Sequence, residues 1–322
     1  MNLSMLAKLC GVSAATVSKA FSGSGEISEE TRNKIFEIAK EHGVYDRYNK
    51  NKYDKKVIAV LCPELNSDYY NNFVTILDKE ITAHGGIMTV SVTNFDEERE
   101  KTLVSYYCSY CKADGIITIN QKADVNEFLN IPIVAIGPSQ SANVKERITY
   151  TNVLGDVVGY LKKNGHTDIG FVGELLTVSK INAFKESLRH HLLPLNEKYI
   201  RTSDLRFEDA GIEVMDKWFE SGEVLPTAIV AAYDYIAIGI IKSITRHGLK
   251  VPDDISVVGM DGINIGNYLE TTLSSISNNS VLCCRKASEI IMKKIKDPLY
   301  REDVEIPSEF IVRASSGRVK RK

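Results

Sequence analysis

The 322-residue sequence has few of the features that mark disordered, secreted or membrane proteins. Its 8 prolines and 21 glycines, beside 43% hydrophobic residues, exclude a collagen-like or disordered chain. No window approaches the ~20 apolar residues that span a bilayer, and the first residues lack the basic and long apolar regions of a signal peptide. We therefore expect a cytoplasmic protein of two or three domains with no membrane partner.

The six cysteines are too sparse for a disulfide framework, so free thiols are expected. Cys108 and Cys111 form one Cys-x-x-Cys pair, which without a second pair is a weak signal for zinc or redox chemistry. His190 and His191 are adjacent, and adjacent side chains on a helix point apart. Because no zinc-protease, Walker or nucleophile-elbow motif is present, the sequence predicts no enzyme activity, no metal and no cofactor.

Basic charge is concentrated near the front of the chain. Residues 1–42 are balanced, residues 43–56 carry a net charge of +3, and the remainder carries −5. This distribution favours a polyanionic partner for the N-terminal region and a different task for the rest.

Residues 1–44 predict three short helices. Ser13 and Ser28 are suitable N-caps for the second and third helices, and Gly11 and Gly43 are suitable terminators. The predicted helices cover residues 3–9, 14–21 and 29–42. Residues 45–56, YDRYNKNKYDKK, contain no aliphatic side chain and predict a basic linker, or a helix that forms only on contact with a partner.

From residue 57 to residue 322, short apolar runs alternate with helical stretches. This alternation predicts βαβ units and parallel sheets that are buried on both faces. The number of strands favours two lobes, each a doubly wound α/β sheet, with ligands bound in the cleft at the carboxyl ends of the strands. The predicted strands are 57–61, 87–92, 115–119, 133–136, 169–172, 228–231 and 255–259, and the predicted helices begin near residues 71, 97, 153, 181, 210 and 236.

Residues 3–19 have the helix, glycine-containing turn and helix of a helix-turn-helix. The second helix begins with small residues, which lets its N-terminal end approach base edges. The hydroxyls of Ser13, Thr16 and Ser18 are suited to phosphate oxygens, and Lys19 can reach guanine or phosphate.

The string GVSAATVSKAFSGSGEISEETRNKIFEIAKEHGV resembles the DNA-binding headpiece of the lactose-repressor (LacI/GalR) family of bacterial transcription regulators. The resemblance implies that Ala14 and Ala15 occupy the two variable reading positions, where they offer only methyl contacts, and that Lys19 is the basic reader. It also implies a homodimer on a near-palindromic double-stranded DNA operator. A three-helix protein-interaction module is the alternative. The residues expected at DNA are Leu3, Ser13, Ala14, Ala15, Thr16, Ser18, Lys19, Ser22, Ser28 and Thr31.

The family's hinge helix, of the type Tyr-x-Pro-Asn-x-x-Ala-Arg-x-Leu, is altered in this sequence. Tyr45 is kept, but no proline, Ala-Arg pair or leucine precedes Lys56. The departure puts insertion of a hinge leucine into the minor groove in doubt. A basic strip that follows phosphates and a solvated tether both stay open.

Later segments are similar to the family's two-lobed domain, which is like type I periplasmic binding proteins. The matching strings are VIAVL at residue 57, YLKKNGH at 160, PTAIVAAYD at 226, ISVVGMD at 255 and EFIVR at 309. The last of these strings resembles the closing strand of the family's domain, so the resemblance implies a strand at 309–313. By position, the resemblance implies effector contacts, although a surface charge or helix cap is an alternative at each position. These contacts are Tyr69, Tyr70, Asn152, Lys180, Arg206, Tyr233, Asp234 and Asp261.

Carboxylates, a basic side chain and tyrosine rings suit the hydroxyls and ring faces of a sugar. Lys180 stands where the family has arginine, and Tyr233 where it has asparagine. The expected effector is a sugar or a derivative, and Lys180 with Arg206 would suit an anionic phosphosugar or sugar acid. The sequence therefore predicts an effector-controlled transcriptional regulator that acts as a repressor. The alternative is a sugar receptor or sugar-handling enzyme that carries an accessory N-terminal domain.

Overall fold

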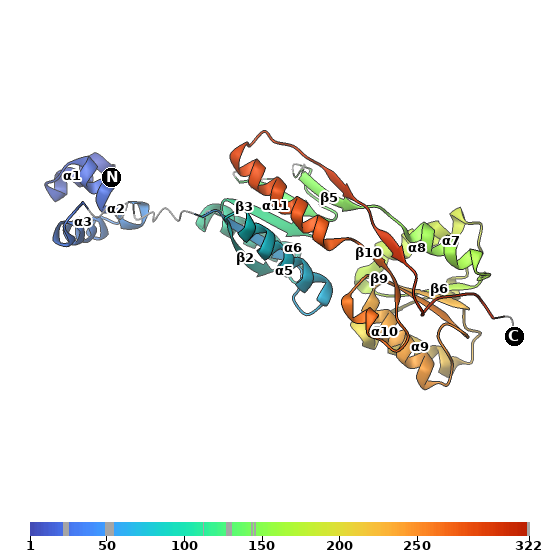
Figure 1. The fold of residues 1–322 in the computed structure, drawn as a ribbon. Coiled ribbons are helices and arrows are strands. Elements are labelled where there is room, and N and C mark those ends of the chain that lie inside the picture. The colour runs from blue at the N-terminus through green and yellow to red at the C-terminus, as the bar shows by residue number, and fades with distance from the viewer. Residues whose placement is uncertain are drawn as a thin grey trace. The chain divides into compact units, whose positions relative to one another are not determined.

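The computed structural model describes residues 1–21, 26–48, 55–111, 113–126, 131–142, 144 and 146–320, without the side chains of residues 46 and 47. The chain forms two compact units, Met1–Lys56 and Val57–Lys322 (Figure 1). Each unit is described by itself below.

The first unit is a bundle of three helices followed by one short helix. Side chains of Asn2, Ser13 and Ser28 accept hydrogen bonds from Met5 N (2.9 Å), Thr16 N (3.0 Å) and Thr31 N (3.3 Å), so both predicted serine caps are confirmed. A fully buried core holds the helices together. The helices are α1 (Leu3–Cys10), α2 (Ala14–Phe21), α3 (Glu29–Glu41) and α4 (Tyr45–Tyr48), and the core includes Leu6, Val17, Ile35 and Ala39.

The short helix α4 lies where the sequence predicted a linker. The rings of Tyr45 and Tyr48 lie 5.9 and 5.8 Å from the ring of Phe21, and the Tyr48 hydroxyl donates to Met1 O at 2.9 Å. The linker was predicted because this segment contains no aliphatic side chain. The rings of the two tyrosines supply the apolar surface that packs against the bundle instead. The structure therefore extends the packed unit to residue 48, while residues 49–54, with Lys50 and Lys52, lie outside the described residues.

The first lobe of the second unit is a fully parallel six-stranded sheet in the order β11-β5-β4-β3-β1-β2. Ile58 and Val60 pack with α5 and α11, whereas Ala59 and Leu61 pack with Val104 on the opposite face. This alternation explains the continuous apolar sequence of the strand. The elements are β1 (Val57–Cys62), α5 (Asp68–Ala83), β2 (Ile87–Val92), α6 (Glu97–Ser105), a π-helix (Tyr106–Tyr110), β3 (Gly115–Ile119), β4 (Ile133–Ile136), β5 (Glu146–Tyr150), α11 (Ser280–Lys296) and β11 (Val304–Ile306).

The second lobe has six strands in the order β12-β10-β9-β8-β6-β7, and only β12 is antiparallel. Figure 1 shows α7 and α8 on one side of this sheet and α9 and α10 on the other. The elements are α7 (Leu154–Lys163), β6 (Ile169–Glu174), α8 (Val178–His190), β7 (Ile200–Ser203), α9 (Phe207–Ser221), β8 (Ala228–Ala231), α10 (Asp234–Arg246), β9 (Ser256–Asp261), β10 (Ser274–Ser277) and β12 (Glu309–Ile311), with 3₁₀ turns at Leu175–Thr177, Glu197–Tyr199 and Asn264–Asn267.

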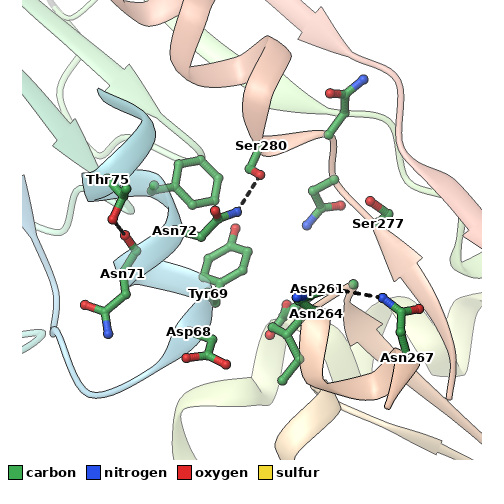
Figure 2. Close-up of a pocket in the computed structure, with 15 residues that line it drawn as sticks. Asp68, Tyr69, Asn71, Asn72, Thr75, Asp261, Asn264, Asn267, Ser277 and Ser280 are labelled. Atoms are coloured by element: carbon green, nitrogen blue, oxygen red, sulfur yellow. Dashed lines mark hydrogen bonds between the residues drawn. The ribbon is translucent and has the colours of Figure 1, made fainter. Parts of the chain in front are cut away.

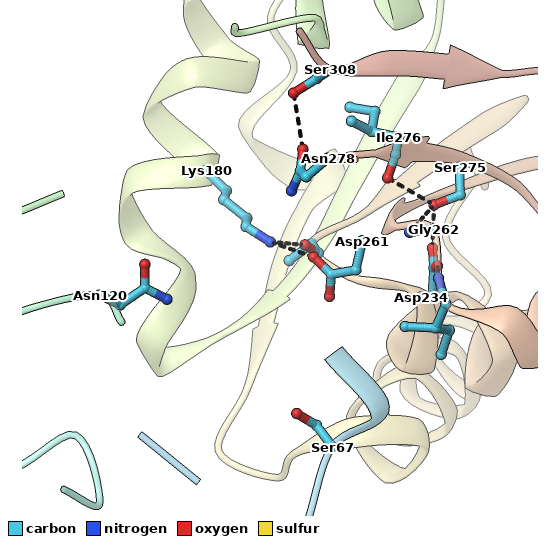
Figure 3. A network of polar contacts seen from close by, with 12 residues as sticks. Ser67, Asn120, Lys180, Asp234, Asp261, Gly262, Ser275, Ile276, Asn278 and Ser308 are labelled. Atoms are coloured by element: carbon cyan, nitrogen blue, oxygen red, sulfur yellow. Dashed lines mark hydrogen bonds and ion pairs between the residues drawn. The ribbon is translucent and has the colours of Figure 1, made fainter. Parts of the chain in front are cut away.

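Three chain segments cross between the lobes, after β5, after β10 and after β11. Ser308 connects all three, because its backbone N–H donates to Thr151 Oγ1 at 2.8 Å and its hydroxyl donates to Asn278 Oδ1 at 3.0 Å. The lobes are therefore joined by one hydrogen-bonded hinge, whose hydroxyl contact is drawn in Figure 3.

The predicted fold class is confirmed: a helical headpiece precedes two doubly wound α/β lobes. Four strands, β5, β7, β10 and β11, and the helix α11 were not predicted. The strands escaped notice because charged and hydroxyl residues interrupt them. β10, with the sequence SSIS, has no apolar run, yet Ser274 and Ser275 are almost fully buried.

The close approach of α9 and α10 provides a test of the packing of the second lobe. A Cβ atom on Gly239 would overlap the backbone carbonyl oxygen of Glu208. Alanine stabilises a helix by about 1 kcal/mol relative to glycine. A net loss of stability in the variant can therefore arise only from this overlap. We expect Gly239→Ala to lower the free energy of unfolding by about 1 to 3 kcal/mol, measured by urea titration. Glu220→Ala, at an exposed position on α9, should change it by less than about 0.5 kcal/mol; equal stability of the two variants would contradict the packing.

Candidate nucleic-acid interface and ligand cleft

The second helix of the first unit, α2, separates a buried face from an exposed face. Val17 and Ala20 are buried against the bundle, whereas Ala15, Ser18 and Lys19 are exposed. The exposed side chains are small apart from Lys19, so this face can approach a surface as closely as its backbone allows.

Lys19 forms an ion pair with Glu26, and both side chains are exposed. An exposed pair of this kind is weak because solvent screens it. The other residues expected at DNA lie on the caps or beside them: the hydroxyls of Ser13 and Ser28 are 2.8 Å from those of Thr16 and Thr31. Ser13 and Ser28 are exposed, and Leu3, Ala14, Thr16 and Thr31 are partly exposed, while Ser22 lies outside the described residues.

In the second unit, the carboxyl ends of the parallel strands of both sheets face a cleft of about 370 Å³. Its lining combines aromatic rings with carboxylate, amide and basic groups, which is typical of a site for a small polar molecule. The lining residues are Glu64, Ser67, Tyr69, Tyr70, Phe95, Asn120, Gln121, Lys122, Gly137, Pro138, Gln140, Tyr150, Glu174, Leu176, Thr177, Ser179, Lys180, Arg206, Phe207, Tyr233, Tyr235, Asp261 and Asn278.

Arg206 bridges the two lobes at this cleft. Its Nη1 and Nη2 donate to the two oxygens of Glu64, which follows β1 in the first lobe, at 2.6 and 3.1 Å. Its Nε donates to Glu174, at the end of β6, at 3.4 Å. The bidentate bond to Glu64 raises the pKa of the guanidinium above its usual value. Phe207 follows with a left-handed φ of 57°, and its N–H donates to the Tyr233 hydroxyl at 3.1 Å.

Lys180 and Asp261 form a second charged pair in the cleft (Figure 3). Lys180 Nζ lies 3.6 Å from Asp261 Oδ1 and donates to Ala232 O at 2.6 Å. Burial raises the pKa of Asp261 to about 6, although Lys180 lowers it in part. Both members of the pair line the cleft, as the sequence predicted for an effector site.

Asp234 lies deeper, at the start of α10, and does not appear among the residues that line the cleft. Its carboxylate accepts from Ile263 N at 2.8 Å and from the Ser275 hydroxyl at 2.6 Å (Figure 3). Burial, followed by the charge of Asp261, raises its pKa to about 8. Asp234 is thus a buried group whose hydrogen bonds connect α10 with β10 and with the segment that follows β9.

Tyrosine rings form much of the cleft wall. Tyr70 accepts from Asn120 Nδ2 at 2.9 Å, and burial raises its pKa above the usual range. Tyr69 packs edge-on against Tyr70 at 5.1 Å, and the Tyr150 hydroxyl donates to Cys283 Sγ at 3.0 Å. These rings stay neutral at physiological pH and offer apolar faces beside polar edges.

A second cavity of about 380 Å³ adjoins the cleft and shares Tyr69, Asp261 and Asn278 with it (Figure 2). Six asparagines, from α5, from the 3₁₀ turn after β9 and from the segment that leads into α11, line it, and Asn72 Nδ2 donates to Ser280 Oγ at 2.8 Å. No basic side chain is found among the described residues that line this cavity. The asparagines are Asn71, Asn72, Asn264, Asn267, Asn278 and Asn279.

The structure brings six of the eight predicted effector residues to the cleft, namely Tyr69, Tyr70, Lys180, Arg206, Tyr233 and Asp261. Asn152 lies just before α7 and is not among the residues that line the cleft; its Oδ1 accepts from the N–H of Leu154, the first residue of that helix, at 3.1 Å. The sequence prediction missed Glu64 and Glu174, the partners of Arg206. Each follows or ends a predicted strand, so the strand-end rule that located the cleft could have found both.

Two other motifs lie outside the cleft. Cys108 lies in the π-helix and is half-buried, while Cys111 is exposed, and both are free thiols. The rings of His190 and His191 meet edge-on at 5.3 Å near the end of α8. In the described part of the chain, no group of three or more histidine, cysteine, aspartate or glutamate side chains is arranged to hold a metal ion.

The raised pKa of Asp234 predicts a pH-dependent stability. The folded chain binds a proton more tightly at Asp234 than the unfolded chain does, so this stabilisation is complete below pH ~4 and is lost as pH rises towards 8, with a slope of up to about 1.4 kcal/mol per pH unit. Asp234→Asn should flatten the fall in urea midpoint between pH 5 and pH 8. Asp204→Asn, at an exposed position, should leave the fall unchanged; parallel curves for wild type and Asp234→Asn would refute the assignment.

Comparisons with known families agree with both units. Residues 3–45 match the family described as bacterial regulatory proteins, lacI family. Residues 158–316 match the family described as periplasmic binding protein-like domain. None of the helices in the described residues is long and apolar enough to cross a membrane.

Among curated relatives, the HTH-type transcriptional repressor CytR of Escherichia coli strain K12 is 24% identical over 299 residues, which cover 88% of this chain and 87% of CytR. The HTH-type transcriptional repressor PurR of Vibrio parahaemolyticus is 25% identical over 326 residues and covers 96% of each chain.

Solved structures share the fold at lower identity. The lac repressor dimer bound to operator and the anti-inducer ONPF is 21% identical, with a TM-score of 0.73 over 98% of this chain and 99% of the other. The transcriptional regulator CelR in complex with cellobiose is 19% identical, with a TM-score of 0.69 over 98% and 100% of the two chains. The capped three-helix unit, the strand order and these matches lead to one conclusion: the chain joins a headpiece of the lacI family of bacterial regulatory proteins to a periplasmic binding protein-like domain.

Proposed function

We propose that this chain is a DNA-binding transcriptional repressor whose affinity for its operator is set by a small polyhydroxylated molecule bound between the two lobes. The observation that carries the proposal is the joining, in one chain, of a headpiece that exposes α2 and a two-lobed unit with a polar, aromatic cleft. The named relatives CytR and PurR are both transcriptional repressors.

The exposed face of α2 is suited to the major groove of DNA. Ala14 and Ala15 stand at its N-terminal end, where methyl groups can contact the thymine methyl. Lys19 supplies the positive charge of this face. Its ammonium group can leave the ion pair with Glu26 and contact a guanine base or a phosphate. The capping hydroxyls of Ser13 and Ser28 lie next to backbone N–H groups that also favour phosphate.

A homodimer follows from the same proposal, since two headpieces related by a two-fold axis read a near-palindromic operator. The structural neighbour bound to operator is a lac repressor dimer. The altered hinge sequence, without the family's leucine, favours phosphate contacts by the basic segment over a wedge in the minor groove.

The effector assigned to the cleft is a sugar or a sugar derivative. The CelR neighbour holds cellobiose, and a LacI family neighbour from Enterococcus faecium, 18% identical with a TM-score of 0.72 over 82% of this chain and 100% of the other, holds ribose. In this chain Asp261, Lys180 and Asn278 can meet hydroxyl groups, while Tyr69 and Phe207 can cover the faces of a sugar ring. Binding that changes the angle between the lobes would shift the population able to hold DNA.

The DNA surface is tested by removing the charge of Lys19. Operator DNA is first obtained by selection from a random duplex pool with the purified chain. Lys19→Ala should then weaken operator binding by ~1 to 3 kcal/mol in a gel-shift titration, because a base or phosphate contact is lost. Lys242→Ala removes the same charge from the exposed side of α10 and should bind as wild type does. An unchanged affinity of Lys19→Ala would contradict the placement of α2 on DNA.

A further inference from the structure

The basic side chains of the cleft are already neutralised by carboxylates of the protein. Arg206 contacts Glu64 and Glu174, and Lys180 contacts Asp261. Lys122, the remaining cation of the lining, is exposed. Among the described residues that line the cleft, no buried basic group is therefore left without a carboxylate partner, although the sequence alone suggested Lys180 and Arg206 as partners for an anion.

The two glutamates that hold Arg206 are more buried than the arginine. The side chains of Glu64 and Glu174 are 8% and 4% exposed, whereas the Arg206 side chain is 33% exposed. An anionic ligand that used the other N–H groups of Arg206 would lie beside two carboxylates, whose charges together exceed that of the guanidinium and repel it. An anionic ligand that took the paired N–H groups would have to displace these carboxylates. The displaced carboxylates would stay buried without a partner, which is strongly unfavourable.

The geometry of the guanidinium restricts a ligand further. Its carbon Cζ lies over two aromatic rings, 5.4 Å from the ring centre of Phe95 and 4.6 Å from that of Phe207. Phe95 belongs to the lobe that holds Glu64. Three of its five N–H groups donate to Glu64 and Glu174, so the two others can donate to a neutral oxygen such as a hydroxyl. An uncharged polyol can use these donors without breaking the ion pairs.

We propose that Glu64 and Glu174 set the charge selectivity of the cleft, so that it accepts uncharged sugars or nucleosides and rejects their phosphorylated or acidic counterparts. The inference rests on the proposed function, which assigns the effector to this cleft. Glu64 and Glu174 act as specificity residues through Arg206: they occupy the cation that a phosphate or carboxylate would need.

The first test uses inorganic phosphate as the anionic probe and requires no knowledge of the effector. Thermal unfolding of the full chain is followed in phosphate and in sodium chloride of equal ionic strength. Wild type should show no phosphate-specific stabilisation that depends on Arg206. The isosteric double variant Glu64→Gln/Glu174→Gln frees the guanidinium and should bind phosphate about tenfold more tightly or better.

The matched control adds Arg206→Gln to the double variant, and it should abolish the gained phosphate binding. Arg206→Gln alone serves as the control for wild type. Any phosphate bound by the headpiece is common to all four proteins and cancels in the comparison. Cooperative urea unfolding confirms that each variant is folded. Phosphate-specific stabilisation of wild type that Arg206→Gln removes would overturn the inference, and so would a folded double variant that gains no affinity for phosphate.

The second test compares matched ligands by calorimetry: ribose with ribose 5-phosphate, glucose with glucuronate, and cytidine with cytidine 5′-monophosphate. Among pairs that bind, the uncharged member should bind wild type about tenfold more tightly or better, and the double variant should reduce this ratio. Tighter binding of an anionic member to wild type would overturn the inference. The two proposals can fail separately. If the phosphate test succeeds while a broad screen of uncharged sugars and nucleosides finds no ligand, the charge selectivity stands and the proposed effector class fails. The gel shift with operator tests the DNA-binding role independently of both.

Discussion

In a parallel β-sheet the carboxyl ends of all strands lie at the same edge, and the ligand cleft of this protein depends on that constraint. Each lobe places the carboxyl ends of its parallel strands on the same opening, so residues far apart in sequence meet there. Glu64 follows β1, Asn120 follows β3, Glu174 ends β6 and Asp261 ends β9. The carboxylates and amides of the cleft are thus a consequence of topology, and side-chain choice at these few positions decides what binds.

The same arrangement couples the two lobes physically. Ser308 holds the three crossing segments together on one side, while the Glu64–Arg206 bridge connects the lobes across the cleft. A change in the angle between the lobes must alter the geometry of this bridge. A ligand that binds beside the bridge therefore acts on the contact that links the lobes, and its binding energy can be converted into a shift between two arrangements.

The sequence was most informative where local chemistry determines structure. Serine caps, terminal glycines and apolar strands predicted the headpiece helices and the central strands of both lobes. β10 was missed because its buried Ser274 and Ser275 satisfy their hydroxyls through Arg313 O (3.1 Å) and Asp234 (2.6 Å), which hydropathy cannot indicate. The resemblance placed Arg206 at the cleft, but its pairing with Glu64, 142 residues away, follows only from the folded chain.

The headpiece shows the same division between local and distant information. The caps of α2 and α3 can be read from the sequence, but the ion pair of Lys19 with Glu26 and the packing of Tyr45 and Tyr48 against Phe21 cannot. In the sequence, tyrosines within a segment that lacks aliphatic residues are typical of a solvated linker. In the folded chain, the three helices provide the apolar surface against which these tyrosines pack. Aromatic residues in such strips therefore need a tertiary partner before their role can be assigned.

The central claim, that occupancy of the cleft controls DNA binding, is tested most directly by thermodynamic linkage. The dissociation constant of the full chain for its selected operator is measured by fluorescence anisotropy without ligand and with a saturating sugar that raises its melting temperature. The account predicts a change in operator affinity, and an equal factor by which saturating operator changes the affinity for the sugar. The same operator affinity with and without a sugar proven to bind in the cleft would contradict it.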